Sequence, residues 1–197
     1  MPKVTEAHRD ARRAQITDAA LRCFAAKGFH RTSMADVIAE SGLSAGAIYG
    51  HFDSKEELFA AAAGRVLSSR GSELEARRAD HGPLAPGEII AVVIDGMRVE
   101  AFEPALMLQV WAEAAVNPDL GEVMRAFLGR VRATLRPHLV AWAEVHPEHA
   151  GVDPEGYADR VLPVIMGLVP GFMIQRAILP DFDADGYLAQ LPGLLPH

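Results

Sequence analysis

Two short helical segments, separated by a turn around one glycine, constrain the fold of this chain more than any other feature. The first covers residues 34–41 and the second residues 45–52, so a short turn at Gly42 connects them. Thr32 or Ser33 can cap the first helix, where Asp36 stands three residues after Ser33 in a variant of the capping box, and Ser44 can cap the second. Glycine readily adopts the left-handed conformation that ends a helix. Two helices joined by such a turn form the helix-turn-helix outline. Any helical hairpin can show this outline, so the flanking sequence has to decide its meaning.

The flanking sequence is helical as well. Apolar residues recur at helical spacing from Ile16 to Phe24, and Gly28 is placed to end that helix. Ser54 and Glu57 have the capping-box spacing that begins another helix. No alternation typical of β-strands persists in the sequence, so we predict an all-α fold. Further helices are expected at about residues 88–102, 104–116, 117–145, 154–179 and 184–195, with the segment HPEHAGVDPEG as a loop.

The charge distribution divides the chain into two parts. The net charge is −7. Residues 1–60 hold eight basic and eight acidic side chains, whereas residues 61–197 hold eleven basic and eighteen acidic ones. Net negative charge repels a polyanion, so only the N-terminal part is suited to approach nucleic acid.

Several classes of protein are not indicated. The single cysteine, Cys23, excludes an internal disulfide and a cysteine-built zinc site, and fits a reducing compartment as a buried thiol. The N-terminus has no apolar signal region, and the longest apolar run, residues 161–174, is too short to cross a bilayer. We therefore expect a cytoplasmic protein with no membrane partner, and we interpret the apolar run as a buried helix.

Motifs of catalysis are not found in the sequence either. It contains no glycine-rich phosphate loop after a strand, no HExxH motif and no nucleophile with a partnered base. The two histidines of HPEH are three residues apart, but a surface loop explains them better than a metal site. We therefore expect no enzymatic activity, no cofactor and no metal.

The run from Ile16 to Leu58 resembles the N-terminal DNA-binding domain of TetR-family transcriptional regulators. Three stretches carry the resemblance: KGFHRTSM before the first short helix, SGLSAGAIYGHF across the turn and second helix, and SKEEL at the next helix start. The resemblance implies a three-helix DNA-binding domain at residues 1–53 and a connecting fourth helix at residues 54–79. It also implies a C-terminal helical domain at residues 80–197 that binds an effector and dimerises.

Hydroxyl groups at helix starts are suited to contact DNA phosphates, because helix N-termini present free N–H groups. Thr32, Ser33 and Ser44 occupy such positions. The resemblance implies that Tyr49 and His51 contact the DNA backbone and that Lys55 adds a cation. Ile48 and Phe52, on the opposite face of the helix, are expected to pack inside the domain.

The base-reading positions depart from the family pattern. Ala45 follows Ser44 at the position where the family often has lysine or another polar residue, and Gly46 and Ala47 come next in the recognition helix that the resemblance implies. Alanine offers only a methyl contact, and glycine only close backbone approach. We therefore expect these residues to read DNA by methyl contact and shape rather than by side-chain hydrogen bonds.

Alternatives remain open for several of these residues. Tyr49 could be only a packing ring, His51 a solvated histidine, and Ser44 only a helix cap. The arginines Arg9, Arg12 and Arg13 could form an arm that enters the minor groove or a flexible solvated tail.

The C-terminal part supplies candidates for an effector pocket and a dimer surface. Bulky apolar residues and one histidine could line a pocket, although each could equally be ordinary core: Met97, Phe102, Met107, Trp111, Phe127, His138 and Met166. The apolar helix with its two glycines, four residues apart, could pair with a second copy, although Pro163 and Pro170 should kink it. Its candidate contacts are Ile165, Gly167, Leu168, Gly171, Phe172 and Gln175.

The sequence thus favours a ligand-responsive transcriptional regulator. It would act as a repressor that binds double-stranded DNA at a palindromic operator as a homodimer and is released by an unidentified small molecule. The alternative is an all-helical interaction module or small-molecule-binding protein whose helix-turn-helix has little sequence specificity.

Overall fold

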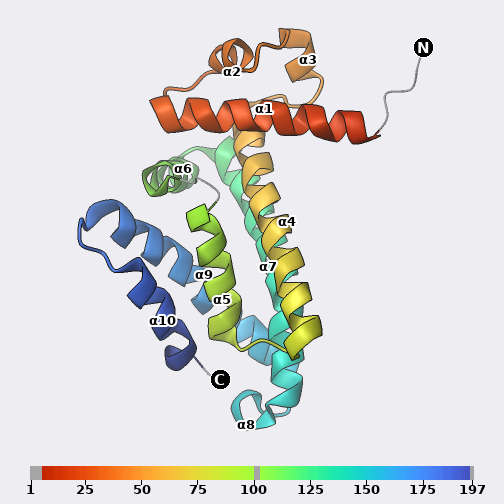
Figure 1. Cartoon of the computed structure of the whole chain (residues 1–197), viewed down its shortest axis with the longest axis vertical. Coiled ribbons are helices and arrows are strands. Elements are labelled where there is room, and N and C mark those ends of the chain that lie inside the picture. Colours follow the sequence, from red (N-terminus) through yellow and green to blue (C-terminus); the bar gives the residue numbers. More distant parts are fainter. Residues whose placement is uncertain (1–5, 100–102, 196–197) are drawn as a thin grey trace. The chain divides into compact units, whose positions relative to one another are not determined.

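The computed structural model describes residues 6–99 and 103–195, and these residues form helices and no strand (Figure 1). This confirms the predicted all-α fold. The helices are α1 (Glu6–Lys27), α2 (Met34–Ser41), α3 (Ala45–Tyr49), α4 (Lys55–His81), α5 (Pro86–Val99), α6 (Pro104–Val116), α7 (Pro118–Val145), α8 (Pro147–Ala150), α9 (Pro154–Ile178) and α10 (Ala184–Leu194).

One local expectation was wrong. The segment HPEHAGVDPEG contains a short helix, α8, which begins at Pro147 because proline is favoured in the first helical turn. Pro163 and Pro170 lie inside α9, which runs from Pro154 to Ile178, and the kink expected at these prolines stays a prediction.

The chain divides into two compact units. The first unit comprises Met1–Arg65 and Gln109–Met124, and the second comprises Val66–Leu108 and Arg125–His197. Helices α4, α6 and α7 therefore each begin in one unit and end in the other. The predicted functional division, with a boundary at residue 80, stays a prediction.

The first unit has an aromatic core. Phe24, Phe29 and Phe59 are buried, with ring centroids 5.3 to 6.2 Å apart. Ile48 of α3 and Phe52, three residues after the end of α3, are also buried, which confirms that both pack inward. The helix itself ends at Tyr49 and is shorter than the predicted segment 45–52. Each such side chain contributes about 1.5–3 kcal/mol on burial, so this core is sufficient to hold a helix of only five residues.

In the second unit, α5 packs against both α9 and α10. Leu162 and Ile165 of α9 join a core with Leu74 of α4 and Leu139 of α7. Two turns later on α9, Phe172 packs with residues of α5 and α10. This leaves the opposite side of α9 without cover from its own unit.

Helix α9 is long and apolar enough to cross a membrane when judged by length and composition alone. A core helix of a soluble protein meets the same criterion, so this property is weak evidence for a membrane.

Candidate nucleic-acid interface

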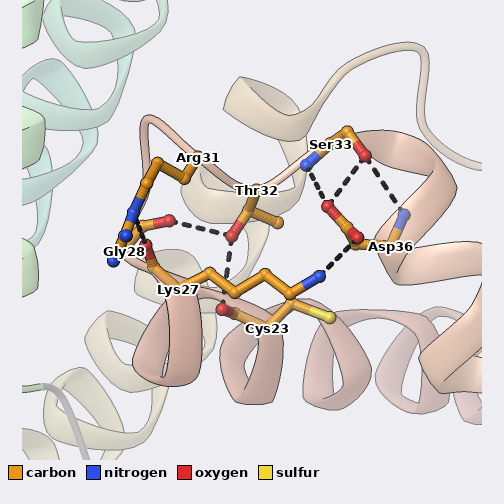
Figure 2. A network of polar contacts seen from close by, with 7 residues as sticks. All are labelled: Cys23, Lys27, Gly28, Arg31, Thr32, Ser33 and Asp36. Atoms are coloured by element: carbon orange, nitrogen blue, oxygen red, sulfur yellow. Dashed lines mark hydrogen bonds and ion pairs between the residues drawn. The ribbon is translucent and has the colours of Figure 1, made fainter.

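The N-terminus of α2 is closed by a reciprocal pair of hydrogen bonds. The Ser33 hydroxyl accepts from the backbone N–H of Asp36 at 3.2 Å, and the Asp36 carboxylate accepts from the backbone N–H of Ser33 at 2.8 Å. Lys27, in the last turn of α1, binds the other carboxylate oxygen at 2.5 Å (Figure 2). Lys27 first, and Ser33 second, lower the pKa of Asp36 below its usual range. This network joins the end of α1 to the beginning of α2.

Thr32 is buried in the turn before α2. Its hydroxyl lies 2.8 Å from the carbonyl oxygen of Gly28 and 3.2 Å from that of Cys23, and donates to them (Figure 2). The hydroxyl is therefore used inside the domain. This placement revises the role that we predicted for Thr32: its side chain shapes the turn and is covered from a phosphate.

Helix α3 presents its N-terminal half to solvent. The Ser44 hydroxyl caps it by accepting from the backbone N–H of Ala47 at 3.2 Å. Ala45 and Gly46 are exposed, Ala47 is half-buried, and Tyr49 is 50% exposed. The predicted base-reading residues thus share an open surface, with the Tyr49 ring at its C-terminal end.

Lys55 is held by the turn between α1 and α2. Its ammonium group donates to the carbonyl oxygens of Phe29 and His30, both at 3.1 Å, and lies 4.8 Å from the centre of the Phe29 ring. The positive charge remains near the start of α4, but the side chain has a structural task besides any contact with DNA.

His51 lies beside the basic residues of α1. Arg13 donates to the backbone carbonyl oxygen of His51 at 3.0 Å, and its guanidinium lies 4.3 Å above the centre of the Phe52 ring. Burial first, then Arg13, Arg9 and Arg12, lower the pKa of His51. The lowered pKa favours the neutral form of the imidazole, and its contact with DNA stays a prediction.

The three arginines are part of a helix. Because α1 begins at Glu6, Arg9, Arg12 and Arg13 are helical, and the flexible-tail alternative does not apply to them. Sequence reasoning missed the contact between Arg13 and residues 51–52, which lie 38 and 39 positions later. Local patterns carry no signal for such a pair.

Comparisons with known proteins agree with this geometry. Residues 16–62 match the family described as bacterial regulatory proteins, tetR family. Residues 88–193 match the BetI-type transcriptional repressor C-terminal family, which covers more than half of the chain. The chain belongs to the TetR family. It is therefore a DNA-binding transcriptional regulator by family, and its relatives are regulators rather than enzymes.

Two curated relatives match about a third or less of this chain. An uncharacterized HTH-type transcriptional regulator of Bacillus subtilis is 52% identical over 58 residues, which are 29% of this chain and 28% of the relative. An HTH-type transcriptional repressor of Mycobacterium tuberculosis is 48% identical over 63 residues, 32% of this chain and 34% of the relative. The match therefore spans about a third or less of these relatives' length.

Longer matches extend over both units. The HTH-type regulator BetI of Burkholderia mallei is 28% identical over 138 residues, which cover 68% of this chain and 70% of BetI. The structure of Salmonella enterica GusR is 28% identical, covers 98% of each chain and has a TM-score of 0.62. A Saccharomonospora viridis regulator in complex with choline is 22% identical, covers 92% and 94% of the two chains and has a TM-score of 0.60, which shows the shared TetR fold.

The predicted pocket residues differ in their surroundings. Met107 and His138 are buried. Met97 and Met166 are partly buried and pack against the core of the second unit. Phe127 is half-buried, and the guanidinium of Arg130 lies 5.7 Å from the centre of its ring. Trp111 belongs to the first unit, unlike the others. Phe102 lies outside the described residues. The pocket stays a prediction.

The predicted dimerisation residues fall on two sides of α9. Ile165 and Phe172 are fully buried within the second unit, because they face α5 and its neighbours. Leu168, Gly171 and Gln175 are half-buried, and Gly167 is exposed. An apolar helix without a polar face gives no signal for which side turns inward. The set as a whole stays a prediction, but its two buried members are unavailable to a partner.

Proposed function

We propose that this TetR-family protein is a ligand-responsive repressor that binds a palindromic operator as a homodimer and is released by a small-molecule effector. The observation that carries the proposal is the exposure of Ala45, Gly46 and Tyr49 on a helix whose other side is buried through Ile48 and Phe52. A helix anchored in this way is suited to enter the major groove with its N-terminal residues. In this proposal the protein acts in the cytoplasm and catalyses no reaction.

In this proposal the contacts with DNA come from three groups. The free N–H groups at the start of α3, near Ser44, bind one phosphate, and the Tyr49 hydroxyl and the neutral His51 ring bind others. Ser33 and Lys55 lie at the starts of α2 and α4 and support this surface. Ala45, Gly46 and Ala47 lie against the bases, where methyl contact and close approach replace hydrogen-bonded readout.

The partner in the homodimer is met by the uncovered side of α9. Val164, Ile174 and Ile178 are 61%, 44% and 66% exposed, and Gly167 lies between them on the same side. Apolar faces of this size are usually covered by another protein surface. A two-fold axis between two such helices would place two reading helices on matching half-sites, which is why the operator is expected to be palindromic.

The first experiment is selection of bound sequences from a random duplex pool with the full-length protein. Enrichment of a palindrome is the expected result. Retention of no duplex above background at low salt would contradict the proposal, and retention without sequence preference would favour the interaction-module alternative.

Tyr49→Phe tests the proposed phosphate contact. The variant loses one hydroxyl, so affinity should fall about three- to tenfold on every duplex alike, because a phosphate contact carries no sequence information. The matched control is Tyr157→Phe, which removes a buried hydroxyl that has no hydrogen-bond partner among the described residues. Fluorescence anisotropy with the selected duplex measures both; equal affinity of Tyr49→Phe and wild type would remove Tyr49 from the interface.

The effector can be sought by thermal stabilisation with a metabolite library. A ligand that binds only the folded state raises the melting temperature, and above Kd the stabilisation grows with the logarithm of the ligand concentration. Choline belongs in the library because a structural neighbour contains it. A hit qualifies as effector only if it also weakens binding to the selected duplex.

A further inference from the structure

The turn between α1 and α2, residues 28–32, is held from outside by side chains of α4 and α6 in the first unit, and Glu113 of α6 also lies 4.0 Å from His30. Lys55 of α4 binds its carbonyl oxygens, as described above. Gln109 of α6 binds its N–H side: the side-chain oxygen Oε1 accepts from the backbone N–H of Phe29 at 3.1 Å. The two partners are 80 residues apart in the sequence.

Gly28 makes room for this contact. Its φ of +79° is in the left-handed region, where glycine is favoured. A Cβ atom at Gly28 would also lie 2.8 Å from Oε1 of Gln109, so the amide of Gln109 would have to shift from its present place. The residue that ends α1 therefore also allows the amide of Gln109 to reach the next N–H of the turn.

The turn has little freedom to move on its own. The Thr32 hydroxyl donates back to Gly28 and to Cys23 of α1, and Arg31 donates to the carbonyl oxygen of Lys27 at 2.8 Å (Figure 2). Ser33 follows immediately and caps α2. The place at which Phe29 is held therefore determines where α2 begins, and the three-residue turn after α2 passes this position on to α3.

We propose that Gln109 is a positioning residue for DNA binding: through the N–H of Phe29 it fixes the α1–α2 turn, and with it α2 and the recognition helix α3. This inference rests on the proposed DNA-binding surface. Gln109 lies on α6 two residues after Met107, one of the predicted effector-pocket residues. Together with the contact between Glu113 and His30, the Gln109 hydrogen bond links this part of α6 to the turn.

The test compares four full-length variants with wild type on the duplex selected by the wild-type protein. Gln109→Leu removes the acceptor, and Gln109→Asn keeps an amide but shortens its reach by one methylene. Gln109→Glu keeps an acceptor oxygen at the same reach. Ala115→Leu is the matched control, because it adds leucine at an exposed position of α6, six residues on, turned away from the Gln109 side.

Well below the melting temperature, Gln109→Leu and Gln109→Asn should each bind the duplex about tenfold more weakly. Gln109→Glu should recover most of the affinity, and Ala115→Leu should leave it unchanged. Amide hydrogen exchange at Phe29, followed by NMR, should accelerate in the two weakened variants only. Agreement of the two variants guards against a folding defect peculiar to one of them.

Two results bear on the inference and on the proposed function separately. The first result is that Gln109→Leu and Gln109→Asn bind the duplex as tightly as the wild type although amide exchange at Phe29 is faster. The hydrogen bond is then merely structural, and the inference is overturned. A lowered melting temperature with unchanged affinity has the same meaning. If the wild type retains no duplex at all, the proposed function fails first, and the positioning role fails with it.

Discussion

Helices α3 and α9 both carry residues that their own unit leaves uncovered, but the residues are of opposite kinds. Helix α3 exposes its N-terminal backbone with Ala45, Gly46 and the Tyr49 ring. Helix α9 exposes aliphatic side chains such as Val164 and Ile178. Free N–H groups at a helix start suit a polyanion, whereas an aliphatic stripe suits another apolar helix. The exposed groups of α3 thus suit DNA, and the exposed groups of α9 suit a second copy of the chain.

Glycines add to this comparison. Gly46 in α3 and Gly167 in α9 are helical, and a Cβ atom at either would meet no other atom within 4 Å. Neither conformation nor internal packing requires glycine there, although glycine costs a helix roughly 1 kcal/mol relative to alanine. Close approach of an external partner is one physical reason for glycine at these two positions. Gly64 in α4 has the same open surroundings but lies on neither proposed surface, so it serves as a control.

The largest effect is expected from Val164→Asp, which tests whether the exposed apolar side of α9 forms the dimer interface. A buried, unpaired carboxylate in each copy should weaken the dimer by about 3 kcal/mol or more, roughly a hundredfold in the dissociation constant. Analytical ultracentrifugation measures the change from dimer to monomer. Val152→Asp makes the same substitution at a fully exposed loop residue and should leave the dimer intact. An unchanged dimer in Val164→Asp would place the interface elsewhere.

Gly46→Ala should have an intermediate effect on the α3 side, with opposite signs for stability and binding. The added methyl group should raise the free energy of unfolding by about 0.5–1 kcal/mol. It should also hold α3 away from the bases and weaken binding to the selected duplex about tenfold. Gly64→Ala should raise stability alone. If Gly46→Ala binds as tightly as wild type, close backbone approach is not part of the readout.

The smallest expected effect is on the pH dependence of stability, and it comes from a buried histidine of the second unit, His138. His138 is buried beside Glu75, at 3.6 Å, and near Arg78; burial outweighs the carboxylate and lowers the pKa of His138. A lowered folded-state pKa means that the contribution to stability is present above pH 6.5, the unfolded value, and is lost as pH falls through the folded value.

His138→Gln should therefore lose less stability than wild type between pH 7 and pH 5, as measured by chemical denaturation at each pH. His8→Asn, which replaces a histidine at an exposed position of α1, is the matched control. Parallel curves for His138→Gln and wild type would show that His138 does not titrate with folding.

The local features of the fold could be predicted because they follow from short-range rules. The capping pair Ser33 and Asp36, the left-handed Gly42 with φ of +68°, and the cap at Ser44 are all present as expected. Ser54 likewise accepts from the backbone N–H of Glu57 at 3.2 Å. Each depends on residues at most a few positions apart, so the sequence pattern contains the whole interaction.

The contacts that hold the reading head could not be predicted in the same way. Three of these contacts join a side chain to a distant backbone group: 26 positions away for Lys55, 38 for Arg13 and 80 for Gln109. The residues next to each side chain in the sequence do not indicate which backbone group it contacts. The orientation of α9 was also beyond the pattern, because Ile165 and Val164 are equally apolar neighbours with opposite exposure. Tertiary packing decides both, and the hydrophobic pattern alone does not contain it.

The burial of Cys23 has a practical consequence for following this molecule. It is the single cysteine of the chain, it lies inside the first unit, and burial raises the pKa of its thiol, so little reactive thiolate forms. A cysteine introduced on the surface would react with a maleimide dye far faster than the native one. One labelled site per copy would then report by energy transfer how far apart the two reading heads stand in the dimer, with and without a bound metabolite.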